Sequence, residues 1–90
     1  MEQTGTLTIR NELGLHARAA ARIVALGDHY RSHLFFVRNN LEVDGSSILS
    51  ILSLACPKGS KLEVKIVGDD SKEFMQALMK LFDDRFGETS

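Results

Sequence analysis

The stretch Lys61-Leu62-Glu63-Val64-Lys65-Ile66-Val67 alternates charged and apolar residues. Successive side chains of a strand point to opposite faces of a sheet, so Leu62, Val64 and Ile66 share one face and the charged residues share the other. One face would then be buried and the other open to water. The stretch therefore predicts an amphipathic strand in a sheet that is covered on one side only.

Three further strands are predicted before this one. Residues 6–10 alternate polar and apolar side chains, and residues 33–38 are rich in aromatic and branched side chains. Asn39-Asn40 follows, and asparagine tolerates the positive φ that a tight turn requires. Because residues 41–43 then resume the alternation, we expect an antiparallel hairpin at this point.

Helical spacing of apolar residues predicts a first and a last helix. Residues 17–27 are rich in alanine, and Gly27 is a plausible end for that helix. The last helix begins after Gly68, with Asp70 or Ser71 as its cap. Its apolar stripe consists of Phe74, Ala77, Leu78, Leu81 and Phe82.

A short helix is predicted over residues 48–54, where either serine of Ser46-Ser47 can cap it. Its apolar residues run almost all the way round. If Ile51 and Leu54 face the core, part of the apolar surface is hard to bury, and an exposed flank of this kind marks a docking surface. Deep packing of the whole helix is the alternative. The residues of the flank are Ile48, Leu49 and Leu52.

The order of predicted elements is β-α-β-β-α-β-α. Ninety residues, 43% of them hydrophobic, are enough for one core and too few for two. The economical solution is an α+β fold with a four-stranded, mostly antiparallel sheet and three helices on one face. We expect a single domain over residues 1–90, ordered from about residue 4 to about residue 86, with residues 87–90 frayed.

Composition excludes several classes of function. Twelve acidic residues nearly balance eleven basic ones, which argues against the basic surface that nucleic-acid binding needs. No apolar run approaches the roughly 20 residues that span a bilayer, and the first residues do not resemble a signal peptide. Cys56 is the only cysteine, so no internal disulfide can form. We expect a cytoplasmic protein without nucleic-acid or membrane partners.

The stretch Gly14-Leu15-His16-Ala17-Arg18, at the start of the first helix, is the candidate functional site of the chain. The N–H groups of a first helical turn lack intrahelical partners and carry the positive end of the helix dipole, so they can bind an anion such as phosphate. Neutral imidazole is a competent nucleophile near pH 7, and Arg18 adds a permanently charged phosphate partner. The alternative is that His16 is only a capping or surface residue.

Two other chemistries would use the remaining histidines or the cysteine. His29 and His33 flank a predicted loop-to-strand boundary, and no cysteine or carboxylate cluster joins them and His16 as metal ligands. A hydrolase built on Cys56 and His16 would lack an orienting acid and an oxyanion motif. We therefore predict neither a metal site nor a cofactor.

These motifs resemble the HPr family, the histidine-containing phosphocarriers of the bacterial phosphoenolpyruvate:sugar phosphotransferase system. Gly14-Leu15-His16-Ala17-Arg18 followed by Ala19-Ala20 is similar to the family's active-site motif. Ser47-Ile48-Leu49, leading into Ser53-Leu54 and Lys58-Gly59, is similar to its regulatory helix and the turn after it. The order of elements is that of the family's open-faced β-sandwich, and the resemblance covers nearly the whole chain.

The resemblance implies a stoichiometric phosphocarrier that is not an enzyme and needs no cofactor. Phosphorylated enzyme I would pass its phosphoryl group to Nδ1 of His16, and phospho-His16 would hand it to a histidine of a IIA-type protein or domain. The N–H groups of Ala17 and Arg18 and the side chain of Arg18 would hold the phosphoryl oxygens. We expect the protein to be a monomer.

The resemblance also implies a regulatory site. Ser47 matches the serine that HPr kinase/phosphorylase modifies in many relatives, and a regulatory docking module that acts through Ser47 is the alternative function. An ordinary N-cap serine is equally compatible with the sequence. Two positions depart from the family pattern, because Ser46 stands where many relatives have a basic residue and Ala19 where they have a proline that stiffens the helix start. The residues that match the family's docking surface are Ala17, Ala21, Ile48, Leu49 and Leu52.

Overall fold

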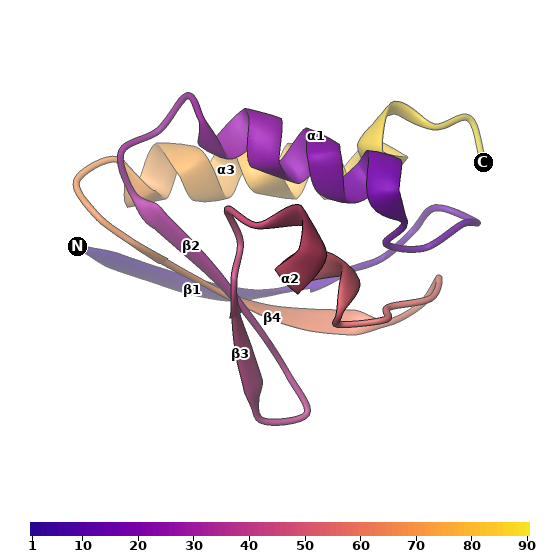
Figure 1. The fold of residues 1–90 in the computed structure, drawn as a ribbon. Coiled ribbons are helices and arrows are strands. Elements are labelled where there is room, and N and C mark those ends of the chain that lie inside the picture. Colours follow the sequence, from indigo (N-terminus) through magenta and orange to yellow (C-terminus); the bar gives the residue numbers. More distant parts are fainter.

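The computed structural model describes residues 1–90. A four-stranded antiparallel sheet carries three helices on one face (Figure 1), which confirms the predicted α+β architecture. The strands lie in the order β1-β4-β2-β3. None of the helices has the length and apolar character needed to cross a membrane. The elements are β1 (Glu2–Thr8), α1 (Ala17–Gly27), β2 (His33–Arg38), β3 (Leu41–Asp44), α2 (Ile48–Leu52), β4 (Lys61–Val67), α3 (Ser71–Asp83) and the 3-10 turn η1 (Arg85–Gly87).

β4 lies between β1 and β2, and its alternation separates the two faces of the sheet as predicted. Leu62, Val64 and Ile66 are buried under the helices, whereas Lys61 and Glu63 are exposed on the open face. Neighbouring strands place further apolar side chains on the buried face, with Leu7 opposite Leu62 and Phe36 opposite Val64. The core therefore lies between the helices and one face of the sheet.

The hairpin between β2 and β3 forms at Asn39 and Asn40, as predicted. Their φ angles are 53° and 66°, the positive values that a tight two-residue turn between antiparallel strands requires. The turn sets the register, in which Arg38 pairs with Leu41 and Phe36 with Val43.

The first strand is displaced from its predicted bounds. It spans Glu2–Thr8 instead of residues 6–10, because it pairs with the whole of β4 from Glu2 opposite Val67 to Thr8 opposite Lys61. The N–H of Ile9 still donates to the carbonyl of Ser60 at 2.9 Å, so the chain stays beside β4 as it leaves the strand. The short helix α2 also ends earlier than predicted, at Leu52.

Residues 87–90 contact the rest of the chain in the structure, and their fraying stays a prediction. Phe86 is fully buried and packs edge-on against Phe82, with ring centroids 4.8 Å apart. Beyond it the chain folds back toward the start of α1 (Figure 1), where the N–H of Glu12 donates to the carbonyl of Ser90 at 3.1 Å. One buried aromatic ring thus anchors a segment whose remaining residues are polar.

The cap of α3 differs from the prediction in detail. Asp70 occupies the N-cap position, but its side chain makes no hydrogen bond to the helix. Its carboxylate instead accepts hydrogen bonds from the N–H groups of Arg31 and Ser32, both at 2.9 Å, and from the Ser32 hydroxyl at 2.5 Å. The side chain at this helix start therefore joins α3 to the loop between α1 and β2.

Candidate functional site

The loop before α1 is fixed by contacts to distant parts of the chain. Gly14 has φ +69° and packs so tightly against the chain at Cys56 that a Cβ on it would lie 2.5 Å from the Cys56 carbonyl oxygen. That oxygen accepts a hydrogen bond from the N–H of Leu15 at 2.8 Å, and the buried Asn11 amide donates to the Gly14 carbonyl at 2.7 Å. These bonds hold the loop that precedes α1.

His16 is the N-cap residue of α1. Its Nδ1 accepts a hydrogen bond from the N–H of Arg18 at 3.2 Å, so Nδ1 presents a lone pair to the first helical turn. The intrahelical ladder begins with the N–H of Ala20, which donates to the His16 carbonyl at 2.9 Å. The N–H groups before Ala20 lie outside that ladder, at the positive end of the helix dipole.

The other ring nitrogen of His16 faces a carboxylate that the sequence analysis missed. Nε2 lies 2.5 Å from Oε2 of Glu88, and Oε1 of the same carboxylate accepts a hydrogen bond from Asn11 at 3.0 Å. A carboxylate can only accept, so a hydrogen bond at this contact requires a proton on Nε2. The His16 side chain is 24% exposed and that of Glu88 only 9%.

The surroundings of Glu88 lower the pKa of its carboxyl group. Its partial removal from water acts to raise the pKa, but the hydrogen bonds from His16 and Asn11, the charge of His16 when its ring is protonated, and the charge of Arg18 outweigh that effect and hold the pKa of Glu88 below its usual range. In the sequence, only Phe86 indicates that the segment with Glu88 packs against the fold, because it is an aromatic residue in an otherwise polar end of the chain.

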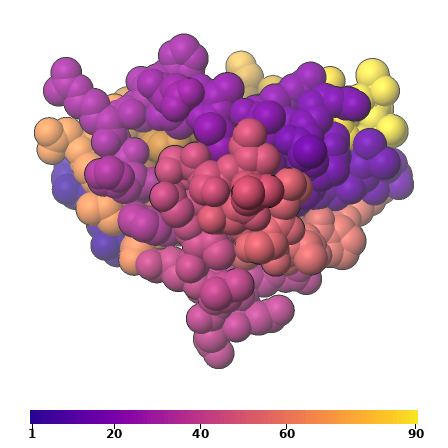
Figure 2. Space-filling model, viewed as in Figure 1, coloured from indigo at the N-terminus to yellow at the C-terminus, as the bar shows by residue number.

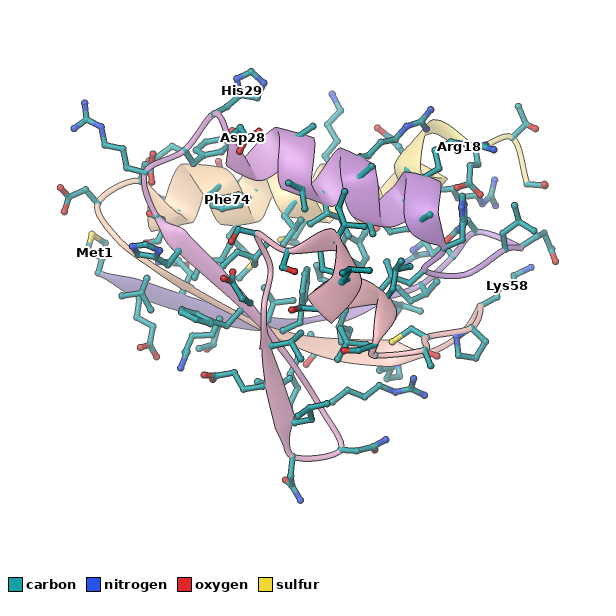
Figure 3. The ribbon with its side chains drawn as sticks, in the orientation of Figure 1. Met1, Arg18, Asp28, His29, Lys58 and Phe74 are labelled. Carbon is teal, nitrogen blue, oxygen red and sulfur yellow. The ribbon has the colours of Figure 1, made fainter.

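Arg18 lies at the mouth of the site, beside the C-terminal segment (Figure 3). Its side chain is exposed and lines a shallow hollow with Arg22 and Leu13 on one side and residues 87–90 on the other. Arg22 is committed to the Phe86 carbonyl, to which it donates a hydrogen bond. Arg18 is thus the guanidinium next to His16 that remains available to an incoming anion.

The predicted docking residues belong to α1 and α2, which contact each other and adjoin on the face of the molecule seen in Figure 2. Leu49 is 79% exposed and Ile48 38% exposed, while Leu52 is half-buried against the core. Ala17 and Ala21 are exposed on α1. The apolar flank expected on the short helix is therefore present, with Ile51 as its buried anchor.

The regulatory candidate occupies the start of α2. Ser47 is the N-cap residue, and its Oγ accepts a hydrogen bond from the N–H of Ser50 at 3.3 Å. Ser46, the other candidate, does not cap the helix; its hydroxyl donates to the carboxylate of Asp44 at 2.7 Å. Of the two serines, Ser47 is therefore the one that caps α2.

The alternative sites do not assemble. His29 lies at the end of α1 opposite to Arg18 (Figure 3), and His33 begins β2, so neither approaches His16. Cys56 is buried, and desolvation raises the pKa of its thiol despite the hydrogen bond and charge of Arg38. A protonated, buried thiol packs as a small apolar side chain.

Comparison with known proteins identifies the family. A family profile described as the PTS HPr component phosphorylation site matches residues 3–84. The chain belongs to the HPr family. Phosphocarrier protein HPr of Xylella fastidiosa (strain Temecula1) is 40% identical over 82 residues, which cover 91% of this chain and 92% of that protein. Phosphocarrier protein HPr of Cupriavidus necator is 42% identical over 81 residues, which cover 90% and 91%.

Solved structures agree with this assignment. The crystal structure of HPr from Thermoanaerobacter tengcongensis superimposes with a TM-score of 0.92 at 34% identity, over 98% of this chain and 99% of that one. A second structure, described as an HPr dimer from the same organism, has a TM-score of 0.76 at 35% identity, over 91% and 94%. The predicted fold and family are thus confirmed, and HPr proteins are phosphocarriers rather than catalytic enzymes.

Proposed function

We propose that the chain accepts a phosphoryl group from phosphorylated enzyme I on Nδ1 of His16 and passes it to IIA-type proteins. The observation that carries this proposal is the pair of contacts that the two ring nitrogens of His16 make. Nδ1 accepts a hydrogen bond from the N–H of Arg18 in the first turn of α1, while Nε2 lies against the carboxylate of Glu88. The nucleophilic nitrogen and the anion site therefore meet at one point.

The chemistry requires only groups of this chain and a phosphorylated donor. The Nδ1 lone pair attacks phosphorus, the bond from phosphorus to the donor breaks, and its electron pair stays on the donor. The N–H groups of Ala17 and Arg18 and the Arg18 guanidinium then receive the phosphoryl oxygens. Transfer to a histidine of a IIA protein runs the same way, with the electron pair of the broken bond returning to Nδ1 of His16.

Both partners would use one surface, since both must bring a reacting atom to His16. We propose that Ala17 and Ala21 of α1 and Ile48, Leu49 and Leu52 of α2 form this docking surface. It adjoins His16, and its exposed apolar side chains suit transient protein contacts. All groups of the site come from a single chain, which supports a monomer as the working form. The lone buried Cys56 supports a cytoplasmic location.

A phosphotransfer assay tests the function. Wild type, His16→Ala and the matched control His29→Ala are incubated with enzyme I and labelled phosphoenolpyruvate. We expect an acid-labile, alkali-stable phosphate on wild type and on His29→Ala and none on His16→Ala, because His29 lies at the other end of α1. Equal labelling of His16→Ala and wild type would refute the proposal.

The alternative function is a regulatory docking module that acts through phosphorylation of Ser47. It is favoured by the position of Ser47, which is only partly buried and directly precedes the docking residues Ile48 and Leu49. A phosphate there would place a dianion beside an apolar surface and repel an acidic partner. Incubation with HPr kinase/phosphorylase and ATP, without phosphoenolpyruvate, tests this function. The alternative predicts label on wild type and on Ser46→Ala but none on Ser47→Ala.

A further inference from the structure

Residues 86–90, called the C-terminal strap below, pass beside the ring of His16. Its anchor is Phe86, which is fully buried and whose carbonyl accepts a hydrogen bond from Arg22. Its far end is held where the N–H of Glu12 donates to the carbonyl of Ser90 at 3.1 Å. Glu88 lies between these two attachments. The attachments at Phe86 and Ser90 therefore hold the segment on both sides of Glu88 and keep its carboxylate next to the ring.

Both carboxylate oxygens of Glu88 have specific partners. Oε2 lies 2.5 Å from Nε2 of His16, and Oε1 accepts from Nδ2 of Asn11 at 3.0 Å. Asn11 is fully buried, and its amide also donates to the carbonyl of Gly14, in the loop that presents His16. The strap and the loop are thus joined through one buried amide, and rotation of the carboxylate away from the ring would break both bonds.

We infer that Glu88 is a positioning residue that keeps the proton of His16 on Nε2 and thereby keeps the reactive lone pair on Nδ1. A neutral imidazole has one N–H, and the group that faces one nitrogen decides which nitrogen is left as the nucleophile. Since a carboxylate offers no proton to share, it favours N–H at Nε2 alone. This inference rests on the proposed function for its consequence in transfer, but not for the state of the ring.

The same carboxylate would act on the phosphorylated form. When the neutral ring forms a bond from Nδ1 to phosphorus and retains its proton on Nε2, the ring becomes positively charged. Glu88 then faces a cation on the Nε2 side of the ring, and Arg18, whose charge also acts on Glu88, lines the hollow beside it. When the phosphoryl group leaves, the electron pair of the broken bond returns to Nδ1 and the ring is neutral again.

The decisive measurement is the tautomer of His16, read from the 15N chemical shifts of the two ring nitrogens in the full-length protein above the pH at which the ring is protonated. We expect wild type to show an unprotonated Nδ1 and a protonated Nε2. Glu88→Gln should shift both resonances toward a mixture, because an amide can donate as well as accept. Glu63→Gln, the same change on the open face of the sheet, should leave both resonances unchanged.

The kinetic consequence is measured separately. We expect Glu88→Gln to accept phosphate from enzyme I about tenfold more slowly than wild type, the scale of one charge-assisted hydrogen bond, while its unfolding midpoint stays close to that of wild type. Identical 15N spectra of Glu88→Gln and wild type would overturn the inference even if both proteins are phosphorylated. Failure of wild type to accept phosphate would instead refute the proposed function and leave the tautomer result standing.

Discussion

The starts of α1 and α2 are built alike and yet differ in how their capping side chains are held. In each, a glycine stands two residues before the cap, Gly14 before His16 and Gly45 before Ser47. In each, the cap accepts a hydrogen bond from an N–H of the first turn, at 3.2 Å for His16 and 3.3 Å for Ser47. The same arrangement of a glycine followed two residues later by a capping side chain therefore occurs at both helix starts.

The difference lies in the second polar atom. His16 has another ring nitrogen, which Glu88 holds, so the ring would keep its orientation if the capping nitrogen were bonded to a phosphoryl group, as proposed. The single Oγ of Ser47 has no partner other than the helix N–H that it caps. A side chain with two distinct polar atoms can be positioned by one and react through the other, and only the start of α1 meets that condition.

The two glycines provide the strongest test of this comparison. A Cβ at Gly14 would combine a φ of +69° with a 2.5 Å approach to the backbone oxygen of Cys56. A Cβ at Gly45 would instead meet the side chain of Leu34, with 2.4 Å to its Cγ. We expect Gly14→Ala to lower the free energy of unfolding by about 3 kcal/mol, measured by urea denaturation, because backbone strain and a backbone clash act together.

Gly45→Ala serves as the counterpart, and its expected loss is smaller, about 2 kcal/mol, since a side chain can move where a backbone cannot. Gly14→Ala should also slow phosphorylation of His16, because the displaced loop carries that residue. A larger loss of stability for Gly45→Ala would show that the loop before His16 is not the more rigidly held of the two.

Removing the cap of α2 should have a smaller effect. We expect Ser47→Ala to lower the free energy of unfolding by about 1 kcal/mol, the usual contribution of a serine cap, because the hydrogen bond to the N–H of Ser50 is lost. Ser60→Ala, a change outside the helices, should stay within about 0.5 kcal/mol of wild type in the same urea titration. Both variants should still accept phosphate on His16. A Ser47→Ala variant that does not accept phosphate would show that the start of α2 affects the start of α1.

The fold could be predicted from local patterns because its elements are amphipathic. The alternation in Lys61–Val67 separates the buried face of the sheet from the open one, and Asn39-Asn40 identifies the hairpin by the positive φ it tolerates. The bounds of β1 were less predictable. Its pairing with β4 starts at Glu2, where the alternation of apolar side chains has not yet begun.

The site was predictable only in the part that is local in sequence. His16 and Arg18 lie two residues apart, and the proposed anion site follows from the helix that begins beside them. Glu88 is 72 residues from His16, in a polar segment without periodicity. A hydrogen bond between such distant residues depends on how the fold closes, here on the burial of Phe86, and no spacing rule records it.

The start of α3 extends the comparison to a third helix and gives the smallest expected effect. Asp70 is the N-cap residue, but its carboxylate serves the loop between α1 and β2. The Ser32 hydroxyl, with the N–H groups of Arg31 and Ser32, lowers the pKa of Asp70 below its ordinary value of 3.8. Because the folded pKa is the lower one, this stabilisation is present above the unfolded pKa and is lost as the pH falls through the folded pKa.

Asp70→Asn should therefore have a slightly lower unfolding midpoint than wild type at pH 7, and the gap should close as the pH is lowered toward about 2. The asparagine amide keeps one acceptor oxygen but turns an NH2 group toward the N–H donors of the loop. Asp69→Asn, the same change one residue earlier, should shift the midpoint little at either pH. Thermal unfolding followed by circular dichroism across this range measures both. A gap that persists at low pH would show that Asp70 acts through the geometry of its side chain and not through its charge.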